Sequence, residues 1–141
     1  MKTRIGIPSI TRTGVIILFA LLLTACGSSE TIPPGSYTAT FTAADNIQVG
    51  GSLMTGVSSI TFTEAGDFTV HAPQATIVGR YSVDGDQITF DDGTGTFPCE
   101  DVPVYVYRWE LDDNMLSFST VEDSCYLRTL AMTAKTYVLD E

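Results

Sequence analysis

The sequence predicts an all-β protein, an antiparallel up-and-down barrel of eight strands. From residue 35 onward apolar residues alternate with polar ones, which is the pattern of half-buried strands. Short sequences rich in Asp, Gly and Asn separate the runs and predict tight turns, and no window carries a convincing helical apolar stripe. Closing the sheet into a barrel removes exposed strand edges. A two-sheet β-sandwich is the alternative, since strand number and spacing alone do not separate the two architectures.

Each strand is predicted from its inward-facing apolar set. In one segment Ile60 and Phe62 alternate with Ser59 and Thr61, which puts the apolar side chains on one face. The eighth segment, residues 127–138, is less regular, and we expect it to complete the barrel. The other inward sets, in chain order, are Tyr37, Ala39 and Phe41; Phe68 and Val70; Ile77, Tyr81 and Val83; Ile88 and Phe90; Tyr107, Trp109 and Leu111; and Leu116 and Phe118.

The first 25 residues have the layout of a secretory signal peptide. Basic residues at the start are followed by an unbroken apolar run over residues 15–23 and then by small residues. A run this short does not cross a bilayer of ~30 Å, which takes ~20 residues in a helix. We therefore expect export of the chain and removal of residues 1–25.

The end of this segment, Leu23-Thr24-Ala25-Cys26, resembles the lipobox of bacterial lipoproteins. The resemblance implies cleavage before Cys26, a diacylglycerol on its sulfur and further acylation of its amine, for example with palmitate. Two or more acyl chains anchor a protein stably. We therefore expect anchoring to the cell membrane or outer membrane through Cys26. Residues 26–34 have no apolar periodicity and are predicted to be a flexible tether, which leaves residues 35–141 as the domain.

Charge excludes some partners. The chain has 7 basic and 17 acidic residues, and cleavage before Cys26 leaves four basic residues against all 17 acids, a net charge of −13. No basic cluster is present to bind a phosphate backbone, so we expect no nucleic-acid partner. Adjacent acids such as Asp112 and Asp113 lie in predicted turns without EF-hand spacing. Solvated turns are therefore favoured over a calcium site, and we predict no metal.

The domain also resembles small bacterial lipocalin-like, or calycin, domains. The resemblance covers most of residues 35–133. It is carried by Gly35-Ser36-Tyr37, by residues 79–90 and 107–111, and by Asp123-Ser124-Cys125 with Arg128. It implies an eight-stranded barrel with a binding role. Lipocalins open with Gly-x-Trp and pack an arginine from the final strand over that ring, so the resemblance implies that Tyr37 and Arg128 form a cation–π pair that closes the barrel.

Cys99 and Cys125 are the two cysteines left after lipidation. Because export takes them to an oxidising compartment, a disulfide between them is the simplest interpretation. The alternatives are a redox pair, which usually has Cys-x-x-Cys spacing, or a metal site, which needs more ligands than His71 supplies.

We predict no enzymatic activity and no cofactor. His71 is the only histidine, and the alternation places it on the outward face of its strand. No nucleophile elbow, phosphate-binding loop or dinucleotide motif is present in the sequence.

Two functions remain. The first is a membrane-anchored lipoprotein that binds a small apolar ligand in its barrel. The second is a packed barrel that acts through its outer surface, as an envelope interaction or inhibitor module. An eight-stranded barrel allows both, and a side-chain-filled interior favours the second. The residues expected to line a ligand site are Tyr81, Phe90, Tyr107, Trp109, Leu116 and Phe118.

Overall fold

The computed structural model describes residues 31–73, 75–95, 99 and 101–141. The predicted signal peptide and the predicted lipidation site, Cys26, lie outside these residues. Among the helices in the described ranges, none is both long and apolar enough to cross a membrane.

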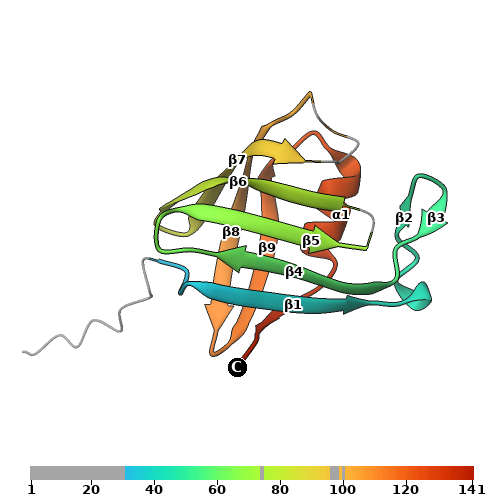
Figure 1. The fold of residues 1–141 in the computed structure, drawn as a ribbon, viewed down its shortest axis with the longest axis horizontal. Coiled ribbons are helices and arrows are strands. Elements are labelled where there is room, and N and C mark those ends of the chain that lie inside the picture. The colour runs from blue at the N-terminus through green and yellow to red at the C-terminus, as the bar shows by residue number, and fades with distance from the viewer. Residues whose placement is uncertain (1–30, 74, 96–98, 100) are drawn as a thin grey trace, which may run out of the picture.

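Eight antiparallel strands close into a barrel (Figure 1), which confirms the predicted fold class and excludes the sandwich. Around the barrel the strand order is β1-β10-β9-β8-β7-β6-β5-β4 and back to β1. The strands are β1 (Gly35–Phe41), β4 (Gly56–Phe62), β5 (Asp67–Ala72), β6 (Ala75–Asp84), β7 (Gln87–Gly95), β8 (Val104–Asp112), β9 (Met115–Glu122) and β10 (Tyr137–Leu139).

The first and last strands close the barrel by pairing with each other. Tyr37 of β1 lies opposite Leu139 of β10 on one side and opposite Ile60 of β4 on the other. The turns have the expected chemistry, because Gly85 and Asp113 adopt positive φ angles of 59° and 53°. The inward faces of the strands agree with the predicted period of two, as in β4, where Ile60 and Phe62 are buried.

The segment predicted as an eighth strand over residues 127–138 is mostly helical, and this expectation was wrong. Helix α1 (Tyr126–Thr133) follows Cys125, whose sulfur accepts a hydrogen bond from the Arg128 amide at 3.4 Å, and the strand is limited to β10. The inward face of the helix is Arg128, Ala131 and Met132, spaced i, i+3 and i+4. Because these three residues include an arginine and cover only one helical turn, the sequence shows almost no apolar periodicity that would predict a helix here.

Two small elements between β1 and β4 were also not predicted. They are a short 3-10 helix, η1 (Ala43–Asp45), and a hairpin of β2 (Gln48–Val49) with β3 (Ser52–Leu53) that projects beside the barrel (Figure 1). The hairpin is fixed at its base, where the Met54 amide donates to the Ile47 carbonyl at 2.7 Å. Both of these residues are buried.

The barrel has two different ends. The turn end carries the tight turns β4–β5, β6–β7 and β8–β9, together with the start of β1 and the end of β10. The helix end carries α1, the β2–β3 hairpin and Cys125. Between them lies one continuous core of aromatic and aliphatic side chains.

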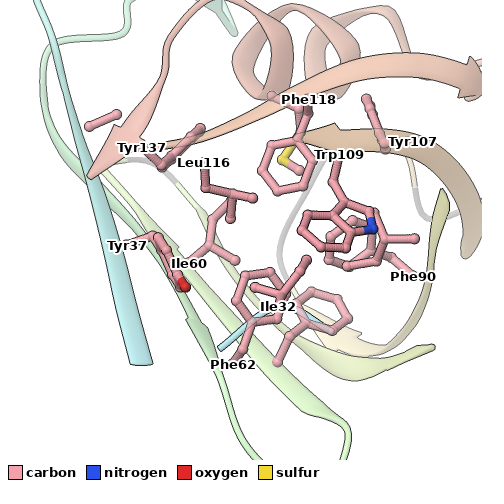
Figure 2. Packing of buried hydrophobic residues seen from close by; sticks show 14 of the residues in the cluster. Ile32, Tyr37, Ile60, Phe62, Phe90, Tyr107, Trp109, Leu116, Phe118 and Tyr137 are labelled. Carbon is pink, nitrogen blue, oxygen red and sulfur yellow. The ribbon is translucent and has the colours of Figure 1, made fainter. Parts of the chain in front are cut away.

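The predicted tether is shorter than residues 26–34. Ile32 is only 3 % exposed and belongs to the core, and the Tyr37 hydroxyl donates to the Pro33 carbonyl at 3.0 Å. Figure 2 shows Ile32 and Phe62 within the same cluster of buried side chains. The chain is therefore held to the barrel from Ile32 onward, because burial of this side chain outweighs the freedom that its Pro- and Ser-rich surroundings predict.

Candidate functional site

The six residues predicted to line a ligand site come together in the barrel, where they pack against one another. Phe90 lies at the centre, stacked on Tyr105 at 5.2 Å between ring centroids and edge-on to Tyr107 and Phe118 at 6.3 and 6.2 Å. Tyr81 lies at the rim, edge-on to Phe62 at 4.9 Å. Leu116 and Tyr107 are fully buried. Figure 2 shows five of the six, Phe90, Tyr107, Trp109, Leu116 and Phe118, among the buried side chains of the core.

Trp109 is buried with the others, opposite Phe118 in the β8–β9 ladder. Its indole N–H is enclosed and has no hydrogen-bond partner among the described residues. A buried donor without an acceptor is costly, by ~1–3 kcal/mol. Trp109 thus stabilises the core through packing, while its buried N–H lowers that stabilisation.

A small cavity of about 30 Å³ lies elsewhere, at the helix end beneath α1. A cavity of this size holds about one water molecule. The lining of this cavity is mostly apolar, but it includes the side chains of Arg128 and Ser58. The remaining lining residues are Met54, Val70, Ala72, Ala75, Ile77, Tyr105, Ala131, Met132 and Tyr137.

A buried ion pair fixes the helix end. The Arg128 guanidinium donates from Nε and Nη2 to the two carboxylate oxygens of Asp123, both at 2.8 Å, and Nη2 also donates to the Val102 carbonyl at 3.0 Å. The Tyr107 hydroxyl and the Cys125 amide donate to the same carboxylate at 2.6 and 2.8 Å. The side chain of Asp123 is completely buried and that of Arg128 is 3 % exposed.

The pKa values follow from this arrangement. Burial by itself raises the pKa of Asp123, but the hydrogen bonds from Arg128, Tyr107 and the Cys125 amide outweigh it and hold the pKa below its ordinary value. Burial raises the pKa of the Tyr107 hydroxyl well above its usual range, and the hydrogen bond to Asp123 raises it further. At neutral pH the site is therefore a carboxylate, a guanidinium and a neutral phenol.

The predicted pair of Tyr37 and Arg128 is replaced by another. The guanidinium carbon of Arg128 lies 3.5 Å from the ring centroid of Tyr105. Tyr37 packs edge-on against Phe62 at 5.9 Å. The expectation was wrong because Arg128 lies on α1 at the helix end rather than on the last strand.

Cys99 and Cys125 form the predicted disulfide, with their Cα atoms 5.8 Å apart. It joins the β7–β8 connection to the residue that precedes α1. The described residues contain no group of three or more His, Cys, Asp or Glu side chains that could hold a metal ion. His71 is exposed, as expected, with Nδ1 3.4 Å from the Thr76 hydroxyl.

The outer wall of the barrel has a hollow of about 320 Å³ over β8 and β9. It is lined by the outward-facing cross-strand pairs Arg108–Ser119 and Glu110–Ser117 and by Asp86, which forms an ion pair with Arg108. Two of the residues predicted to line a ligand site, Trp109 and Phe118, also contribute to this lining. Two further ion pairs among the described residues join the exposed Arg80 to Asp67 and the half-buried Lys135 to Asp45. The wall therefore presents carboxylates and hydroxyls.

Sequence reasoning missed Asp123 as a partner of Arg128, although the Asp-Ser-Cys block contains it. The available signal was two adjacent acids, Glu122 and Asp123, close to an arginine and a cysteine, which does not distinguish a buried ion pair from a solvated turn. No protein-family model, no curated protein and no solved structure matches this chain.

Proposed function

We propose that this protein is an extracytoplasmic lipoprotein, anchored through Cys26, whose packed barrel acts without chemistry through its outer surface, as an envelope interaction or inhibitor module. One observation carries this proposal: the aromatic side chains around Phe90 pack edge-on and stacked in the barrel centre. Among the described residues, the cavity at the helix end measures about 30 Å³, far below the ~300 Å³ of a usual ligand pocket. Recognition then falls to the surface.

The charge of the surface indicates the chemistry of a partner. Arg80, Arg108 and Lys135 each pair with an aspartate, and the 17 acidic residues far outnumber the four basic residues that follow residue 25. Charge of one sign steers partners of the opposite sign and repels like charge. A partner that carries exposed lysine or arginine side chains fits this surface, and a nucleic acid does not.

Two observations support export and anchoring. The Cys99–Cys125 disulfide is typical of an oxidising, extracytoplasmic compartment. Ile32 is buried and follows Cys26 by six residues in the sequence, so the folded domain begins close to the proposed lipid attachment site.

Native mass spectrometry of the protein purified from a bacterial envelope tests both parts of the proposal. We expect the mass of a chain that begins at Cys26, increased by a diacylglycerol and an acyl group and lowered by the two hydrogens of the disulfide, with nothing else bound. In Cys26→Ser the acyl mass is absent. A wild-type chain without acyl mass contradicts the anchor, and a further bound small molecule contradicts the packed interior.

A second candidate is the binding of a small apolar ligand, and the cavity beneath α1 is the observation that favours it. Its lining is mostly apolar, and Arg128, Ala131 and Met132 of α1 form part of it. The variant Ala75→Val fills part of this cavity. If a ligand binds there, the variant weakens its binding; if the barrel acts through its surface, the variant leaves partner binding unchanged.

A further inference from the structure

The point where the chain enters the barrel determines which end of the molecule can approach a membrane. Ile32 is buried at the turn end, and the Tyr37 hydroxyl holds the Pro33 carbonyl at 3.0 Å. Gly35 then pairs with Phe62, the last residue of β4, next to the β4–β5 turn. An anchor that precedes Ile32 therefore pulls on the turn end.

The available chain is short compared with the barrel. From Cys26 to Ile32 there are six residue steps, which span at most ~20 Å when fully extended. Strand β6 has ten residues, and at ~3.3 Å per residue and a tilt of ~40° it rises ~25 Å along the barrel axis. If the helix end touched the bilayer, the turn end would stand ~25 Å above it, which is farther than the ~20 Å that residues 26–32 can span.

We propose that the turn end of the barrel faces the lipid bilayer and the helix end points away from it; this rests on the proposed anchor at Cys26. The turn end is then the part of the domain nearest the lipid headgroups. It leaves the helix end, where Tyr126 is 73 % exposed, turned toward soluble partners. The β2–β3 hairpin projects on the same side as α1 (Figure 1).

The charge of the turn end determines which lipid surface it fits. Glu64, Asp84, Asp112 and Asp113 are exposed in its three tight turns. Carboxylates are repelled by anionic headgroups, and this repulsion decays within a Debye length of ~8 Å at physiological ionic strength. The turn end therefore lies close to a zwitterionic bilayer and stands off an anionic one at low salt.

Energy transfer to labelled lipids tests this orientation on the lipidated full protein in vesicles. With Cys26 alkylated by its lipid and Cys99 bonded to Cys125, an introduced cysteine is the free thiol that a dye can label. We compare Glu64→Cys at the turn end with Ser52→Cys in the β2–β3 hairpin, on phosphatidylcholine vesicles that carry an acceptor dye on their headgroups. Transfer is severalfold higher from position 64 than from position 52. On phosphatidylglycerol vesicles at low salt, transfer from position 64 falls, and added salt restores it.

Two further measurements separate the possible failures. Flotation with the vesicles, lost in Cys26→Ser, tests the anchor independently of orientation. A protein that floats but transfers equally from both positions, or more from position 52, overturns the orientation and leaves the anchor standing. A protein that does not float overturns both. In Ile32→Asp the segment around residue 32 is released from the barrel, which lengthens the tether. The difference in energy transfer between positions 64 and 52 should therefore decrease.

Discussion

Arg128 and Asp123 are joined by two hydrogen bonds of 2.8 Å in a position where neither side chain meets solvent. Arg128 lies on the first turn of α1 and Asp123 just after β9, so the pair fixes the helix to the barrel wall. The hydrogen bond from Nη2 to the Val102 carbonyl adds the β7–β8 connection to the same point. One ion pair thus positions three segments at the helix end.

Removing the charge of Asp123 leaves the buried guanidinium without its carboxylate. We expect Asp123→Asn to lower the free energy of unfolding by ~3–5 kcal/mol, because breaking a buried ion pair leaves an uncompensated charge. Urea unfolding followed by far-ultraviolet circular dichroism measures this. The matched control Asp112→Asn removes an exposed carboxylate and changes stability by ~0.5 kcal/mol or less. Equal effects of the two substitutions would show that the pair contributes little.

The lowered pKa of Asp123 predicts a loss of stability in acid. The pKa is lower in the folded than in the unfolded chain, so the stabilisation is complete above the ordinary value of 3.8 and is lost as the pH falls through the lowered value. The Tm of the wild type should therefore fall more steeply below pH 4 than that of Asp123→Asn. Parallel curves for the two proteins contradict this assignment.

The disulfide should stabilise the domain independently of the ion pair. Cys99 and Cys125 are 26 residues apart, and closing a loop of this length contributes ~3.5 kcal/mol in the chain-entropy model. We expect Cys99→Ser to lower the urea midpoint accordingly without changing the strand spectrum, and reduction of the wild type to have a similar effect. A midpoint that is unchanged in both experiments would mean that the helix end is held by its other contacts alone.

Ile32 should contribute to folding although it precedes the barrel. Truncating this buried side chain in Ile32→Ala is expected to cost ~2–4 kcal/mol, since a core aliphatic side chain is lost. Val57→Ala, at an aliphatic residue that is 62 % exposed, is the matched control and should cost less than ~1 kcal/mol. A negligible loss of stability in Ile32→Ala would show that Ile32 is part of the flexible tether rather than of the core.

The barrel could be predicted from the sequence because its strands follow the period of two. Ile60, Phe62 and Phe90, for example, face inward as their alternation with polar residues predicts. Turns such as the one at Gly85 follow from local chemistry, and the disulfide follows from cysteine number and compartment. The strands and turns depend on local sequence, and the disulfide depends on the number of cysteines and on the compartment.

The helix end could not be predicted in the same way. Helix α1 is stabilised by long-range contacts, since Arg128 reaches Asp123, Val102 and Tyr105, and none of these contacts produces a periodic pattern. The burial of Ile32 also depends on the closed barrel rather than on its neighbours in the chain. The predicted ligand residues were placed correctly on the inward face, but alternation does not reveal whether inward side chains leave a space.

Fluorescence of Trp109 tests the packed interior most directly. It is the only tryptophan and is buried next to Phe118 in the barrel, so a ligand that entered the barrel would change its emission. In titrations with palmitate and retinol we predict no saturable change in intensity or wavelength up to millimolar concentration. A saturable change at micromolar concentration would contradict the account and assign the barrel a ligand.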